Sequence, residues 1–141
     1  MQINHLIIDC PDIHRKSLIK LLHSLPHLRT LKLYSLLLGE DIDVVSAADN
    51  IIKVNLGRIH ELQDIEFFLD LCPQMEYLEV DCSDVKLLMT SILTRTSQLR
   101  IVCLHWQNLD EQQIIKELKD MNQLENCTIT CIDKNLCIQL K

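Results

Sequence analysis

The residues of this chain best suited to chemistry are its cysteines and histidines, and the most suggestive pair is Cys103 and His105. Two positions apart on an extended strand, side chains point to the same face of a sheet. A thiol beside an imidazole base is the arrangement of a cysteine nucleophile. No glycine-rich turn or oxyanion-hole motif accompanies the pair, so a thiol enzyme or redox protein is the remote alternative, and we expect no enzymatic activity.

A second group of cysteines, near the C-terminus, raises the question of a zinc site. Cys127, Cys131 and Cys137 have the spacing C-x3-C-x5-C, and His105 is a conceivable fourth ligand. Structural zinc sites favour tight C-x2-C pairs held in loops. Cys127 instead occupies an apolar position of a repeated pattern, which a small buried thiol suits well. The sequence therefore favours packing, and we expect neither a metal nor a cofactor.

The elements that must position these residues follow from a short pattern, apolar-x-x-apolar-x-apolar, which occurs six times. The copies begin near residues 3, 28, 51, 75, 99 and 124. Self-similarity at such a period predicts a solenoid of stacked units, here one domain spanning residues 1–141. Every pattern position is apolar: Ile3, Leu6, Ile8, Leu28, Leu31, Leu33, Ile51, Val54, Leu56, Met75, Leu78, Val80, Leu99, Val102, Leu104, Leu124, Cys127 and Ile129.

Each copy of the pattern predicts a short strand, and the residues between copies predict a helix. Apolar spacings of four and three, typical of one helix stripe, indicate helices over 12–24, 61–71, 83–95 and 110–121, and a short one over 43–48. Asp12, Asp84 or Ser83, and Asp110 are the expected N-caps. The fold class is therefore α/β, with about six strand–helix units that form a parallel concave sheet and convex helices. Residues 135–140 are expected to add a last strand that closes the stack.

The composition excludes several classes of function. The net charge of −6 argues against a nucleic-acid partner, which needs a clustered basic face. No apolar run approaches the roughly twenty residues that span a bilayer, so we expect no membrane partner. Residues 1–10 lack the basic start and apolar run of a secretory signal. Seven cysteines without such a signal indicate a reducing compartment, cytoplasmic or nuclear.

The best candidate for a binding site is the concave face of the predicted sheet. Basic residues fall in its second and third units and acidic residues in its fourth, which suits a protein partner of complementary charge. Tyrosine and tryptophan, which are common in binding hot spots, lie at or beside this face. The predicted protein-binding residues are Arg29, Lys32, Tyr34, Lys53, Asn55, Tyr77, Glu79, Asp81, Cys103, His105 and Trp106.

Two junctions give the pattern a family likeness. Cys-Pro-Gln-Met-Glu-Tyr-Leu-Glu-Val at 72–80 and Leu-Pro-His-Leu-Arg-Thr-Leu-Lys-Leu at 25–33 resemble the C-P-x-L-x-x-L-x-L joints of F-box leucine-rich-repeat proteins. The resemblance implies a repeat domain that recruits a substrate for a ubiquitin ligase, while an N-terminal F-box docks on a Skp adaptor and its cullin. These residues contain no F-box segment, so either one is missing at the N-terminus or the protein has none. The alternative is a stand-alone leucine-rich-repeat scaffold or inhibitor with no ligase link.

Overall fold

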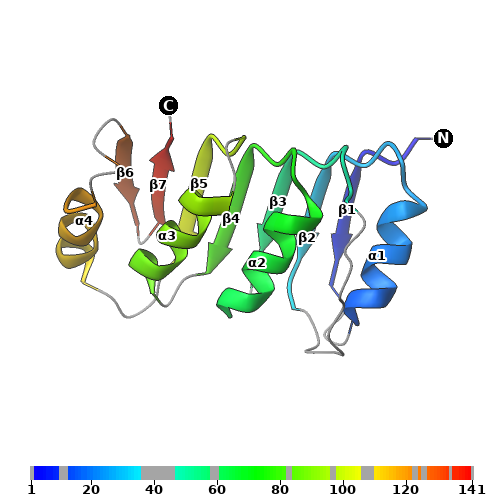
Figure 1. Ribbon diagram of the computed structural model, residues 1–141, viewed down its shortest axis with the longest axis horizontal. Helices are drawn as coiled ribbons and strands as arrows, with labels where there is room; N and C mark the ends of the chain where they lie inside the picture. Colours follow the sequence, from blue (N-terminus) through cyan, green and yellow to red (C-terminus); the bar gives the residue numbers. More distant parts are fainter. Residues whose placement is uncertain are drawn as a thin grey trace.

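The chain forms a single mixed sheet with helices along one of its sides (Figure 1). The structure, a computed structural model, describes residues 2–9, 13–35, 47–57, 61–81, 84–95, 98–105, 110–121, 124, 127–133 and 135–140. Those residues form four helices and seven strands. The architecture is α/β with a mostly parallel sheet, in agreement with the fold class expected from the sequence.

The first five strands are parallel and lie side by side in sequence order. Matching positions of successive copies are register partners, because Leu31 pairs with Val54, Val54 with Leu78, and Leu78 with Val102. Each of these copies therefore adds one strand in constant register. The strands are β1 (His5–Ile8), β2 (Thr30–Leu33), β3 (Lys53–Leu56), β4 (Tyr77–Asp81) and β5 (Ile101–His105).

The four helices lie inside the ranges that the apolar spacing predicts. They are α1 (Arg15–His23), α2 (Leu62–Leu71), α3 (Val85–Arg95) and α4 (Glu111–Lys119). In the expected short helix over 43–48, residues 43–46 lie outside the described residues. Ala47 and Ala48, which are described, are not helical.

Two of the predicted N-caps are formed. The Asp110 carboxylate accepts a hydrogen bond of 3.1 Å from the backbone N–H of Gln112, and the Asp84 carboxylate accepts one of 3.1 Å from that of Leu87. Both satisfy backbone donors that the first turn of a helix leaves unpaired. Asp12 and Ser83 lie outside the described residues, and α1 begins after His14, whose side chain makes no capping bond.

The core lies between the sheet and the helices, and the first residue of the pattern enters it as predicted. Leu28, Ile51, Met75, Leu99 and Leu124 are each at most 5% exposed. Strand residues alternate, so that in β2 Leu31 and Leu33 are fully buried while Thr30 and Lys32 are partly exposed. The first copy is the exception, because Ile3 is 43% exposed at the outer edge of the sheet, as expected for an end unit.

The predicted parallel position of the sixth copy is wrong. Its strand β6 (Thr128–Ile132) lies at the sheet edge, and β7 (Asn135–Gln139) is inserted between it and β5, antiparallel to both. The reason is a tight turn at Asp133, with φ of 47°, together with the burial of Leu136 and Ile138, both 0% exposed. Ile129 of β6 is only partly buried, so β7 is the better strand to cover β5.

We expect Asp110→Ala to lower the free energy of unfolding by about 1 kcal/mol, because the variant loses the cap of α4. Urea denaturation followed by circular dichroism measures this change. Asp120→Ala is the matched control, since it removes a carboxylate at the other end of the same helix, where negative charge is unfavourable. Equal losses in the two variants would contradict a capping role for Asp110.

Candidate functional site

The side of the sheet that faces away from the core carries most of the predicted binding residues. We call it the open face and define it by the strand residues that alternate with the buried ones. On the parallel strands these are His5, Ile7, Thr30, Lys32, Lys53, Asn55, Tyr77, Glu79, Asp81, Ile101, Cys103 and His105, and Tyr34 and Gly57 directly follow β2 and β3. On the C-terminal hairpin they are Thr128, Thr130, Ile132, Asn135, Cys137 and Gln139.

The register brings the predicted residues into rows across the strands. One row runs through Lys32, Asn55, Glu79 and Cys103, and it continues to Cys137 on β7. A second row holds Thr30, Lys53 and Tyr77, and a third pairs Asp81 with His105. Arg29 is exposed just before β2. Trp106, the remaining predicted residue, lies outside the described residues.

The basic half of the open face consists of two lysines that rest on tyrosine rings. The Lys32 ammonium lies 5.1 Å from the centre of the Tyr34 ring, and the Lys53 ammonium lies 4.6 Å from that of Tyr77. Contact with the Tyr34 hydroxyl raises the pKa of Lys32. Cation–π contact holds each flexible lysine over a flat aromatic surface. Gly57 leaves room for this arrangement, because a Cβ there would lie 3.1 Å from the Tyr34 ring.

The acidic part of the open face is engaged within the sheet. The Asn55 amide donates to one oxygen of Glu79 over 2.8 Å, and His105 Nε2 lies 2.5 Å from the other. The second ring nitrogen of His105 faces the side-chain oxygen of Asn135. Both carboxylate oxygens of Glu79 are therefore satisfied by neighbouring strands. The Lys32 and Lys53 ammonium groups, by contrast, lie over tyrosine rings.

The thiol–imidazole pair of Cys103 and His105, which was the remote alternative, is not formed in the structure. Cys103 is buried, and its sulfur accepts a hydrogen bond from the Tyr77 hydroxyl over 3.4 Å. Its other partner is the Cys137 sulfur at 2.6 Å, whereas the partners of His105 are Glu79 and Asn135. The partnership of Cys103 with Cys137 was not predicted from the sequence, because residues 135–140 were expected to close the end of the sheet, whereas β7 pairs with β5.

The three cysteines of the C-x3-C-x5-C segment are separated by the hairpin. Cys137 lies on the open face opposite Thr130, while Cys131 is one position further along β6 and therefore faces the opposite side of the sheet. Among the residues that the structure describes, no three His, Cys, Asp or Glu side chains form a group that could hold a metal ion.

Because several thiols are buried, the stability of the fold decreases at alkaline pH. Burial raises the pKa of Cys72 from an ordinary 9.0 to about 12, and burial followed by contact with Cys103 raises that of Cys137 to about 11. Above the ordinary value the unfolded chain has lost these protons while the folded chain keeps them. Because the unfolded state then binds fewer protons, stability falls as pH rises.

We therefore expect the urea midpoint to fall between pH 9 and pH 11, with a smaller fall in Cys72→Ala than in the unsubstituted chain. Urea denaturation at a series of pH values measures this effect, with each midpoint compared with that of the same variant at pH 7. A midpoint that stays constant over this interval would contradict the assigned protonation of the buried thiols.

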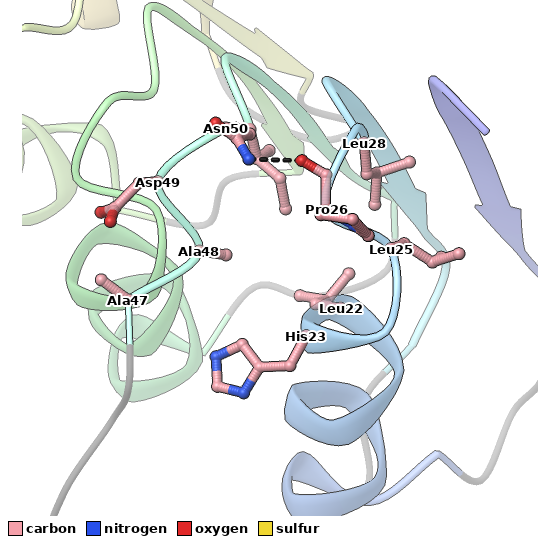
Figure 2. A pocket seen from close by; sticks show the side chains of 10 residues that line it. Leu22, His23, Leu25, Pro26, Leu28, Ala47, Ala48, Asp49 and Asn50 are labelled. Carbon is pink, nitrogen blue, oxygen red and sulfur yellow. Dashed lines mark hydrogen bonds between the residues drawn. The ribbon is translucent and has the colours of Figure 1, made fainter. Parts of the chain in front are cut away.

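A pocket of about 180 Å³ lies away from the open face, between the end of α1 and the segment that leads into β3 (Figure 2). Leu22 and His23 form one wall and Ala48 the other. The Asn50 amide closes one side by donating a hydrogen bond to the carbonyl oxygen of Pro26. Pockets that bind small organic ligands usually measure about 300–1,000 Å³, so this pocket is small for such a ligand.

Comparison with models of known protein families finds no match to this chain, and comparison with curated proteins finds no match either. The proposed function therefore rests on the geometry and charge of the open face. In the part of the chain that the structure describes, none of the helices has the length and apolar character needed to cross a bilayer.

Proposed function

We propose that this chain is a non-enzymatic protein-interaction module of the leucine-rich-repeat type, and that it binds an acidic segment of a partner protein on its open face. The repeated pattern, the constant register of the first five strands and the restriction of α1, α2 and α3 to one side of the sheet support this proposal (Figure 1). Repeat proteins use such extended sheet faces to bind other proteins.

The observation that carries the proposal is the pair of lysine–tyrosine contacts on β2, β3 and β4. The tyrosine rings hold the Lys32 and Lys53 side chains in place. Binding of a partner therefore costs less side-chain entropy than it would with freely rotating lysines. Tyrosine rings are common anchors in interfaces. The Arg29 backbone, just before β2, accepts the Lys53 N–H over 3.1 Å. The two lysines favour a partner segment rich in carboxylates.

The charge of the open face changes from basic to acidic across neighbouring strands. Glu79 and Asp81 lie on β4, next to the basic residues of β2 and β3. A partner segment would match the charges if its acidic residues lay over β2 and β3 and none lay over β4. The same segment bound in the reverse orientation would place its carboxylates against Glu79. We therefore expect one orientation of the bound segment to be preferred.

The resemblance to F-box leucine-rich-repeat proteins extends the proposal to a pathway. On this view the open face binds a ubiquitin ligase substrate, and the ligase link passes through a Skp adaptor and a cullin. Co-precipitation of the endogenous protein, with partners identified by mass spectrometry, tests the link. Recovery of the adaptor and the cullin would support the receptor. Stoichiometric recovery of a different protein without them would identify a stand-alone repeat scaffold.

A further inference from the structure

We infer that Cys103 and Cys137 form a dithiol that converts reversibly into a disulfide, which makes this pair a covalent modification site on the open face. The two residues lie opposite each other on the antiparallel strands β5 and β7. Their sulfur atoms are 2.6 Å apart, and both cysteines are free thiols. This inference does not depend on which partner the open face binds.

The backbone already has the geometry that a disulfide requires. Residues directly opposite each other in an antiparallel pair have Cα atoms about 4.5 or 5.5 Å apart, depending on the hydrogen-bonding pattern. Disulfides join Cα atoms that are about 4.4–6.8 Å apart. Either pattern therefore allows the bond without movement of β5 or β7. Among the other described cysteines, Cys131 has Leu136 as its register partner, so β6 and β7 offer it no opposing thiol.

The surroundings distinguish the two sulfurs. Cys103 is 6% exposed and accepts the hydrogen bond of Tyr77, while Cys137 is more accessible at the hairpin. Burial and the contact with Cys103 raise the pKa of Cys137 to about 11, which lowers its thiolate fraction at neutral pH and slows its reaction with an oxidant. Because Cys137 is the more accessible thiol, we assign it as the one that attacks the oxidant first, and Cys103 as the resolving thiol.

The oxidant is a small disulfide, such as oxidised glutathione. Cys137 loses its proton, and its thiolate attacks one sulfur of the oxidant, so that a mixed disulfide forms and one glutathione thiolate leaves. Cys103 then loses its proton and attacks the Cys137 sulfur, which forms the protein disulfide and releases the second glutathione. The protein gives up two electrons and two protons, and the oxidant becomes two thiols.

The product would join the C-terminal hairpin to the parallel part of the sheet. The bond closes a loop between residues 103 and 137 through α4 and β6, and a loop of this length removes considerable freedom from the unfolded chain. Because Cys103 is the register partner of Glu79, the bond also fixes β5 beside the acidic strand β4 of the open face. The expected result is a rise in the melting temperature of about 10 °C.

The test treats the purified chain with oxidised glutathione, blocks the remaining thiols with an alkylating reagent, and analyses the peptides without reduction. We expect one intramolecular link, between Cys103 and Cys137, with the other five of the seven cysteines alkylated, and full reversal by dithiothreitol. Cys103→Ser should instead keep glutathione on Cys137. Cys131→Ser, which removes a thiol from the neighbouring strand, should form the link normally.

Three results would overturn the inference. The first is alkylation of all seven cysteines after oxidant treatment, and the second is a link between other cysteines in the unsubstituted chain. The third is a fall in the melting temperature on oxidation, because the sheet would then have to distort to accept the bond. Circular dichroism of Cys103→Ser and Cys131→Ser confirms that the variants compared are folded.

Discussion

Reversal of the two open-face lysines, in the variant Lys32→Glu/Lys53→Glu, should weaken binding of an acidic partner by about a hundredfold or more. Each substitution replaces an attraction with a repulsion at a place where the tyrosine rings direct the charge. Thermal stability should remain nearly unchanged, because cation–π contacts at exposed sites are weak. Titration of the labelled partner by fluorescence anisotropy at two salt concentrations measures the affinity.

The control for this prediction is Lys86→Glu/Lys116→Glu, which makes the same change in net charge on α3 and α4. Both lysines are exposed and belong to the helices. We expect this variant to bind nearly as well as the unsubstituted chain. Similar weakening in both variants would show that overall charge, and not the open face, governs binding. A loss of folding in the open-face variant without a specific binding defect would also contradict the account.

Asp64→Ala should lower the free energy of unfolding by about 3–5 kcal/mol, which is the largest stability effect we expect. Asp64 on α2 is 4% exposed and makes a 2.5 Å ion pair with Arg15 on α1. The guanidinium also lies 5.1 Å from the centre of the Phe67 ring. Within the described residues, the buried Arg15 Nε has no hydrogen-bond partner, so loss of Asp64 would leave this cation poorly compensated.

The double variant Arg15→Met/Asp64→Leu distinguishes charge pairing from packing. Replacement of a buried ion pair by apolar residues of similar volume is often neutral or stabilising. Urea denaturation should therefore show the double variant to be clearly more stable than Asp64→Ala. If the two variants were equally unstable, packing at the α1–α2 contact would explain the loss, and the ion pair would contribute little.

The sequence predicted the part of the fold in which each unit repeats the apolar pattern of its neighbour. The pattern from Leu28 to Leu104 determines both the strand and its inward side chains, and these strands lie in constant register. The hairpin could not be predicted in this way. Whether β6 or β7 pairs with β5 depends on competition between two apolar strands, and the burial of Leu136 and Ile138 decides it.

For the candidate site, the sequence predicted which residues share a face but not the contacts between them. The alternation of strand residues predicted that Lys32, Lys53, Tyr77 and Glu79 share a face, and the register agrees. Their contacts were not predictable, because the stacking of Lys53 on Tyr77 depends on the spacing between strands rather than on the sequence of either one. The contact between Cys103 and Cys137 exists because β7 pairs with β5. It could not be predicted, because the strand order at the C-terminal end of the sheet was predicted incorrectly.

The most direct test of the open face as a protein-binding surface is site-specific photo-crosslinking in cells. A photoreactive amino acid would replace Thr30, the register partner of Lys53 on the open face, or, as the control, Lys86 on α3. We predict that illumination links the Thr30 position to a discrete partner protein, and that Lys32→Glu in the same chain abolishes the adduct. Absence of an adduct at Thr30, or the same adducts from Lys86, would contradict the assignment of the open face as the binding surface.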